Sequence, residues 1–216
     1  MNRSDIAIVI PAYNEAESIV RVIEEVKPFG QVIVTNDCST DDTENVAEAA
    51  GAIVVSHAQN KGYDGALSSG MEKAHELGCK LVVTFDADGQ HTVERLQVFL
   101  DKLDSGVDLV LGVRPETARL AEWIFAQHAR LLWGIRDPLC GMKGYNMNLW
   151  VYNHGFDHCQ SIGSELAIQS IRRGAVFEQV EIPIMDREHG SPRFGRLLKA
   201  NWKIFTAMLR VTKLRK

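Results

Sequence analysis

Two acidic residues two positions apart, Asp86 and Asp88, follow the apolar run 81–85. On an extended backbone such residues point to the same side, so the two carboxylates are expected to project together. The pair repels itself unless a cation lies between its members, and Gln90 adds a neutral carbonyl oxygen close by. Mg²⁺ or Mn²⁺ prefers such oxygen ligands, completed by substrate phosphates. The segment predicts a metal site for a diphosphate substrate, where the cation neutralises the leaving group; the alternative is a plain Asp-rich turn.

Further polar residues follow two earlier apolar runs. The first set, Pro11-Ala12-Tyr13-Asn14-Glu15, comes after 6–10, and the second, 36–41, contains Asp37 and comes after 32–35. In an open parallel sheet, ligands bind beyond the carboxyl ends of the strands. The three sets together therefore predict one binding crevice. Taken alone, the set around Asp37 could merely cap a helix.

The elements that must position these residues can be identified from hydrophobic periodicity. Apolar runs at 6–10, 32–35, 53–55, 81–85 and 109–111 alternate with helical stretches at 15–26, 41–50, 65–77 and 93–103. This alternation predicts an α/β fold with a mostly parallel central sheet flanked by helices. Beyond residue 113 we expect helices over 116–133 and 163–173 and a strand over 176–183, in a part that shapes the second substrate's site.

Five motifs in order resemble those of family 2 glycosyltransferases, in particular the dolichyl- or polyprenyl-phosphate mannosyltransferase branch. They are Pro11-Ala12-Tyr13-Asn14-Glu15, Asp37-Cys38-Ser39-Thr40-Asp41 with Asn60-Lys61-Gly62, Asp86-Ala87-Asp88-Gly89-Gln90-His91, Arg136-Asp137-Pro138-Leu139-Cys140-Gly141 and Arg187-Glu188-His189-Gly190-Ser191-Pro192. The resemblance covers roughly residues 5 to 195. It implies a GT-A fold that binds a nucleotide sugar, with a single catalytic domain over 1–192, made of a nucleotide-sugar half (1–113) and an acceptor half (114–192).

The resemblance also implies roles for individual residues. The nucleoside would be held by Pro11, Ala12, Tyr13, Glu15 and Asp37, with Lys61 near the donor; the metal and diphosphate would be held by Asp86, Ala87, Asp88 and Gln90. Arg114, Arg136 and Arg187 are candidates for binding donor or acceptor phosphate, because a guanidinium meets phosphate oxygens with two parallel hydrogen bonds; Arg119, Arg130 and Arg193 compete for these roles.

The chain departs from the pattern of the branch at several positions. Asn36 and Cys38 replace the usual Asp and the usual Gly or Ser, Cys140 stands where Ser is common, and Pro192 replaces a Lys. The last two changes remove a hydroxyl donor and a cation from the expected phosphate sites. They weaken the inference of mannose and of a polyprenyl phosphate more than they weaken the fold.

The acceptor decides whether the reaction needs a base. Members of this family invert the anomeric carbon in one displacement, and a lipid phosphate is already anionic. A saccharide hydroxyl, the alternative acceptor, would need a carboxylate to remove its proton, and Asp137 and Glu165 are the candidates. The donor is expected to be GDP-mannose or a UDP-sugar. A non-catalytic module that binds nucleotide sugars is a further alternative; a sugar-nucleotide pyrophosphorylase is disfavoured because no Gly-rich triphosphate loop follows the first run.

Charge separates the C-terminal stretch 193–216 from the rest of the chain. It carries eight basic and no acidic residues, against 16 basic and 28 acidic residues before it. Apolar residues recur in it at helical spacing, which predicts a basic amphipathic helix. This helix is expected either to lie on an anionic membrane or to pack on the domain or another subunit, and the chain could pair with a separate membrane protein. Nucleic acid is not an expected partner, because the remainder is acidic and lacks a binding motif.

Composition narrows the class of protein. The 216 residues are 45% hydrophobic and 24% charged, typical of one globular domain. The four cysteines form no CxxC pair, so free thiols are expected rather than a disulfide framework or a zinc site. Neither a signal peptide nor a membrane-spanning run is recognisable, which predicts a cytoplasmic protein, peripheral at the cytoplasmic face of a membrane.

Overall fold

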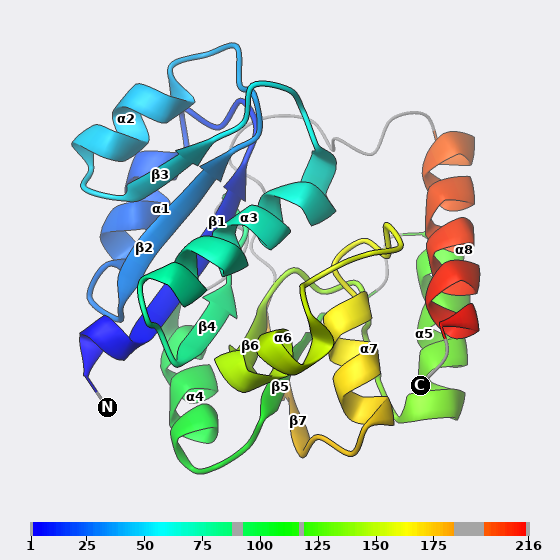
Figure 1. Cartoon of the computed structure of the whole chain (residues 1–216). Coiled ribbons are helices and arrows are strands. Elements are labelled where there is room, and N and C mark those ends of the chain that lie inside the picture. Colours follow the sequence, from blue (N-terminus) through cyan, green and yellow to red (C-terminus); the bar gives the residue numbers. More distant parts are fainter. Residues whose placement is uncertain (1, 88–92, 117–118, 184–196, 215–216) are drawn as a thin grey trace.

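A seven-stranded sheet forms the centre of the protein in a computed structural model that describes residues 2–87, 93–116, 119–183 and 197–214. Its strand order is β3-β2-β1-β4-β6-β5-β7 (Figure 1). The strands are β1 (Ile6–Ala12), β2 (Gln31–Asn36), β3 (Ile53–Ser56), β4 (Leu81–Thr84), β5 (Leu109–Val113), β6 (Lys143–Asn146) and β7 (Phe177–Glu181). All neighbouring pairs are parallel except those of β6, so the predicted α/β class and mostly parallel sheet are confirmed.

Helices cover both faces of the sheet, which explains why its strands are apolar throughout. On one face α1 (Ile19–Val26), α2 (Thr43–Ala49) and α4 (Val93–Asp104) share a core with β1 and β4. On the other face lie α3 (Gly62–Glu76), α5 (Leu120–Trp133), α7 (Glu165–Arg172) and α8 (Leu197–Lys213). Two short elements, a 3₁₀ turn (Arg3–Asp5) and α6 (Met147–Asn153), complete the described structure. The helix at 41–50 and the helices beyond residue 113 therefore form near their predicted positions.

A close approach between α3 and β1 depends on a helical glycine. A Cβ atom at Gly70 would lie 2.3 Å from Cγ1 of Val9. Any side chain at this position would push the helix away from the strand. The approach brings the start of α3 toward the carboxyl ends of β1 and β2.

The antiparallel strand β6 is the main feature that the sequence did not predict. It is inserted between β4 and β5, with Thr84 opposite Lys143 on one side and Leu111 opposite Lys143 on the other. Because β6 runs against its neighbours, its first residues lie at the carboxyl ends of the parallel strands. The segment 137–143 thus enters the sheet from the edge where the polar sets are expected.

The C-terminal helix α8 packs beside α5 (Figure 1). One of its faces is buried, through Ala200, Ile204, Ala207, Met208 and Val211. The sequence left open whether the apolar side of this helix packs on the domain, and the burial of Met208 and its neighbours shows that part of it does. Trp202, Phe205 and Leu209 are exposed. None of the helices in the described ranges has the length and apolar character that crossing a bilayer requires.

Candidate active site

The structure brings the two earlier polar sets and Asp86 to one edge of the sheet. Ala12 at the end of β1 lies opposite Asn36 at the end of β2, and the amide of Asp37 donates to the carbonyl of Ala12 at 2.8 Å. On the other side of β1, the amide of Phe85 donates to the carbonyl of Val9 at 2.9 Å, so Asp86 follows at the same edge. The predicted gathering of these residues therefore matches the arrangement of the strands.

Of the two acidic residues in the predicted metal motif, Asp86 lies within the described residues. The Tyr63 hydroxyl, from the first turn of α3, donates to Oδ1 of Asp86 at 3.3 Å. A Cβ atom at Gly141 would come within 2.1 Å of Oδ2 of Asp86, so glycine is required for the carboxylate to occupy this place. Loss of hydration and the neighbouring Asp86 charge raise the pKa of Tyr63 well above its usual value. Tyr63 therefore stays a neutral hydrogen-bond donor toward Asp86.

The remaining residues of this motif have different positions. The Ala87 side chain is buried in the core that contains α1 and α4, so it would contribute backbone groups at most. Asp88 and Gln90 lie outside the described residues, as do Arg187 and Arg193. Their predicted roles stay predictions.

A buried lysine, which the sequence analysis did not identify, lies beneath this edge. Lys143 is 2% exposed and its Nζ donates to the carbonyl of Cys140 at 2.5 Å. Burial lowers the pKa of Lys143, while the nearby negative groups, including Asp137 and Asp86, act in the opposite direction. No periodic pattern marks 143–146 as a strand, so the burial of this lysine could not be predicted.

Arg114 and Asp137 form a two-contact ion pair at the end of β5. The Arg114 Nε and Nη2 atoms lie 2.7 and 3.0 Å from the two oxygens of Asp137. Burial alone would raise the pKa of Asp137, but the hydrogen bonds and charge of Arg114 outweigh it and lower that pKa. A carboxylate held in this way is a weak proton acceptor. The arrangement disfavours Asp137 as the general base considered above, and gives it a role in orienting Arg114.

A second buried acid, Glu122 in the first turn of α5, extends this pair. Its Oε2 lies 3.3 Å from Nη2 of Arg114, and its Oε1 lies 2.8 Å from Nη1 of Arg119. Two guanidinium groups therefore share one carboxylate. Arg136 lies apart from them, since its Nη2 is 2.9 Å from Oε1 of Glu181 at the end of β7.

Asp37 has structural partners on both of its oxygens. Oδ1 accepts from the Lys61 amide at 2.8 Å and lies 2.7 Å from Nδ1 of His57, and Oδ2 accepts from the Gly62 amide at 2.8 Å. His57 in turn lies 2.9 Å from the Ser69 hydroxyl. Through these contacts the carboxylate holds the segment 57–62 and the start of α3 in place. The nucleoside contact predicted for Asp37 would have to compete with these partners, and Lys61 has an exposed side chain.

The loops after β1 and β2 are fastened to each other. The Asn14 amide donates to the Ser39 hydroxyl at 2.9 Å, and the Thr40 amide donates to Oδ1 of Asn14 at 2.7 Å. The Glu15 amide donates to the Thr43 hydroxyl at 2.8 Å. Asn14 adopts a positive φ of 53°, which turns the chain between Tyr13 and Glu15. Pro11 and Ala12 belong to β1 itself, and Tyr13 is 39% exposed at its end.

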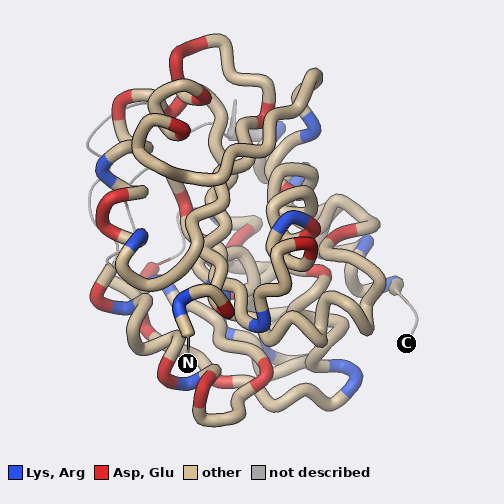
Figure 2. Tube along the Cα trace, turned by 60° about the vertical axis from the view of Figure 1, so that its left-hand side comes forward, with Lys and Arg blue, Asp and Glu red and all other residues tan. Residues whose placement is uncertain are grey.

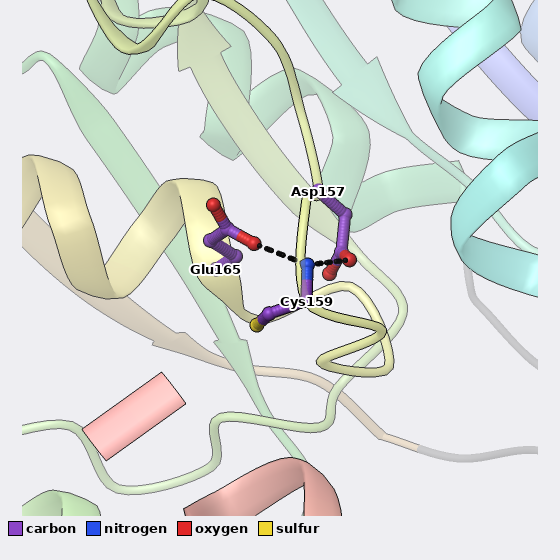
Figure 3. Close-up of side chains that lie close together, drawn as sticks. All are labelled: Asp157, Cys159 and Glu165. Carbon is purple, nitrogen blue, oxygen red and sulfur yellow. Dashed lines mark hydrogen bonds between the residues drawn. The ribbon is translucent and has the colours of Figure 1, made fainter. Parts of the chain in front are cut away.

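Three residues with side chains that can bind a metal ion, Asp157, Cys159 and Glu165, lie close together in the segment from α6 to the start of α7 (Figure 3). The Cys159 amide donates to Oδ1 of Asp157 and to Oε2 of Glu165, at 3.0 Å in both cases. Glu165 also accepts from the His158 amide at 2.6 Å. Burial and the adjacent carboxylates raise the pKa of Cys159, which keeps it a thiol. The acids therefore hold the loop 157–165 in place, which also disfavours Glu165 as a general base.

The start of α3 contacts this loop through Asp64, whose carboxylate accepts from the Gly163 amide. Burial and the charge of Asp157 raise the pKa of Asp64 to about 6. Up to residue 183, the described part of the trace carries both acidic and basic positions (Figure 2), whereas α8 carries basic residues and no acidic ones.

Comparison with solved structures defines the fold. Glucosyl-3-phosphoglycerate synthase from Mycobacterium tuberculosis, solved with Mg²⁺ and UDP, superimposes with a TM-score of 0.78, covering 98% of this chain and 80% of that chain at 23% identity. The predicted GT-A fold is thereby confirmed.

The family follows from the sequence. The model of the Glycosyl transferase family 2 matches residues 7–161, and the chain belongs to this family. A dolichyl-phosphate hexose transferase of Haloferax volcanii is 30% identical over 201 residues, covering 85% of this chain and 84% of the relative. A UDP-N-acetylglucosamine–dolichyl-phosphate N-acetylglucosaminyltransferase of Methanococcus voltae is 32% identical over 129 residues, which are 50% of this chain and 51% of the relative, so the match spans about half the length of that protein. The predicted resemblance to the polyprenyl-phosphate branch is confirmed.

Proposed function

We propose that this protein transfers a hexose from a nucleoside-diphosphate sugar to a polyprenyl phosphate, with inversion at the anomeric carbon. The observation that carries the proposal is the position of Asp86, at the carboxyl edge of the sheet with Gly141 leaving room for its carboxylate. The names of the two dolichyl-phosphate relatives support the acceptor class. The UDP bound in the Mycobacterium tuberculosis structure supports a nucleoside diphosphate in the same fold.

The residues at this edge fit a divalent cation. Asp86 offers carboxylate oxygens, the donors that Mg²⁺ and Mn²⁺ prefer, and we assign Asp88 and Gln90 to the same ligand set. When bound, the cation supplies charge neutralisation for the departing diphosphate. Tyr63 orients Asp86 through its hydroxyl, and the buried Lys143 side chain interacts electrostatically with Asp86. These groups position and neutralise, so no enzyme nucleophile is required.

The two carboxylates considered as general bases, Asp137 and Glu165, already have partners within the protein, which favours an anionic acceptor. Asp137 is paired with Arg114, and Glu165 accepts two backbone amides and is 3% exposed. A saccharide hydroxyl would require one of them to remove a proton. A polyprenyl phosphate requires none, because its attacking oxygen is already ionised. A saccharide acceptor, as in the synthesis of cell-surface polysaccharides, is thus the weaker alternative.

Nucleotide binding tests the donor site directly. We expect UDP or GDP with Mn²⁺ to raise the unfolding temperature of the purified protein, since a ligand at about 100 times its dissociation constant stabilises a fold by roughly 2.7 kcal/mol. The corresponding nucleoside monophosphate is the control, and is expected to act weakly because it lacks the β-phosphate that meets the cation. A protein that responds to no nucleotide diphosphate would contradict the proposal and favour a non-catalytic module.

We also propose that α5 and α8 lie on an anionic membrane surface, where a polyprenyl phosphate would be available. Both helices expose large apolar side chains, Trp123 at 53% and Trp202 at 69%, while α8 carries Lys199, Lys203, Arg210 and Lys213. Basic residues near an anionic leaflet contribute about 1 kcal/mol each, and aromatic side chains enter the headgroup region. A separate membrane protein could occupy the same surface.

Vesicle binding is the test of this surface. We expect the protein to sediment with vesicles of phosphatidylglycerol and less with vesicles of phosphatidylcholine, and the double variant Trp202→Ser/Phe205→Ser to bind about tenfold more weakly. Tyr152→Ser is the matched control, because Tyr152 is 70% exposed on α6, a different helix. Equal binding by both variants would show that α8 does not carry the interaction.

A further inference from the structure

Two arginines near the start of α5 are paired with a buried carboxylate of the protein itself. Arg114 and Arg119 both contact Glu122, with N···O distances of 3.3 and 2.8 Å. The Glu122 side chain is 5% exposed, whereas those of the two arginines are 18% and 19% exposed. The carboxylate therefore lies behind guanidinium groups that reach the surface. Together with Asp137, it cancels the charge of both arginines.

One oxygen of Glu122 is incompletely satisfied. Oε2 is buried and has no hydrogen-bond partner among the described residues, although Arg114 is within ion-pair distance. Burial of a carboxylate oxygen without a full set of donors is costly, so this contact is weaker than the Arg114–Asp137 pair. The helix N-terminus beside it favours negative charge in general and does not distinguish a carboxylate from a phosphate.

The pair is connected to the proposed transfer site. Asp137, the other partner of Arg114, begins the segment that leads to Gly141, which lies against Asp86. Lys143, two residues further along, interacts electrostatically with both Asp137 and Asp86. An anion bound to Arg114 would thus be coupled, through Asp137 and Lys143, to the segment that lies against Asp86.

We propose that Glu122 is the internal counter-ion that the phosphate group of the acceptor replaces on Arg114 and Arg119, and that it thereby sets the affinity for the acceptor. This inference rests on the proposed function. While no acceptor is bound, the carboxylate keeps two guanidinium groups together without an excess of positive charge. A phosphate monoester, which carries more charge and three acceptor oxygens, competes for both guanidinium groups. The affinity for acceptor is consequently lower than two unpaired arginines would give.

Neutralising Glu122 tests this inference. Glu122→Gln keeps the shape of the side chain and removes the competing charge, so the variant is expected to bind farnesyl phosphate at least about tenfold more tightly than the parent protein, because hydrogen bonds to charged groups are involved. Binding is measured by titration calorimetry in the presence of UDP and Mn²⁺. In transfer assays the KM for farnesyl phosphate should fall while the KM for the sugar nucleotide stays unchanged.

The control variant is Glu178→Gln, which removes a carboxylate paired with Lys102 on a different part of the surface and should leave both affinities unchanged. Glu122→Ala provides a second test if the amide variant does not fold. Inorganic phosphate is titrated in parallel, and a gain for it equal to the gain for farnesyl phosphate would show that the site recognises the phosphate group alone.

Equal or weaker binding of farnesyl phosphate by the Glu122 variants would overturn the inference. If UDP still binds in that case, the proposed function stands and only the role of Glu122 is wrong. If the parent protein binds neither UDP nor farnesyl phosphate, the proposed function itself fails.

Discussion

Replacing Asp86 with Asn is expected to lower kcat/KM for sugar transfer on the order of 100- to 1000-fold, because a charge that stabilises the transition state through the bound cation is lost. Asn has nearly the shape of Asp and still fits beside Gly141, where even a methyl group would collide with the side chain. The fold should therefore remain intact. Steady-state kinetics with the donor found by nucleotide binding measure the effect.

Asp108→Asn is the matched control for this experiment. Asp108 lies just before β5, at the opposite edge of the sheet, and its Oδ2 accepts from the Val176 amide at 2.9 Å. Its replacement should leave transfer unchanged. Mn²⁺ should no longer raise the unfolding temperature of Asp86→Asn in the presence of UDP or GDP. A variant that keeps both its activity and its response to Mn²⁺ would show that Asp86 is not a ligand.

Replacing Asp37 with Ala is expected to lower the free energy of unfolding by about 3–5 kcal/mol. Asp37 is 4% exposed, and its replacement leaves the Lys61 amide and the His57 ring without this partner, while the Gly62 amide keeps the Asn60 side chain as an acceptor. Each buried donor left in this way costs about 1–3 kcal/mol. Urea unfolding followed by circular dichroism measures the loss.

Asp42→Ala in the same polar segment is the control. Asp42 is exposed, and its side chain makes no capping hydrogen bond to α2 but accepts one from the Asn45 side chain. Its replacement should therefore change stability by no more than about 0.5 kcal/mol. A different outcome is that Asp37→Ala is as stable as Asp42→Ala but no longer binds nucleotide. Asp37 would then be a nucleoside ligand, as the family resemblance implies, and not a residue that stabilises the segment 57–62.

The parallel part of the fold could be predicted because local signals there agree with the tertiary structure. The runs 6–10, 32–35 and 109–111 are apolar on both faces, as a strand between two helical layers must be. Strand β6 gives no such signal. Its sequence, Lys-Gly-Tyr-Asn, contains a charge and a glycine, and it becomes a strand only because β4 and β5 offer hydrogen bonds on both sides. Tertiary pairing of this kind overrides local propensity.

The position of a candidate site residue could be predicted where that residue follows directly from the end of a strand, as Asp86 does. The orientation of a side chain could not be predicted in the same way. Asp37 was assigned to a ligand but turns toward His57 and two amides, and Arg114 was assigned to phosphate but contacts two carboxylates. Those partners lie 8 to 25 residues away in the sequence, so no spacing rule could reveal them. Glu122 was unremarkable as a sequence position and became informative only through its burial.

The antiparallel strand also governs when the site can form during folding. Thr84 and Lys143, which pair across β4 and β6, are separated by 59 residues. Gly141 and Lys143 reach Asp86 only after this long loop has closed, and pairing of such sequence separation is slow compared with helix formation. A nascent chain that ends before residue 141 can form β1, β2 and β4, yet it has no Gly141 beside Asp86. Under the proposed function, we therefore expect donor binding to appear late in folding, when the sheet is complete.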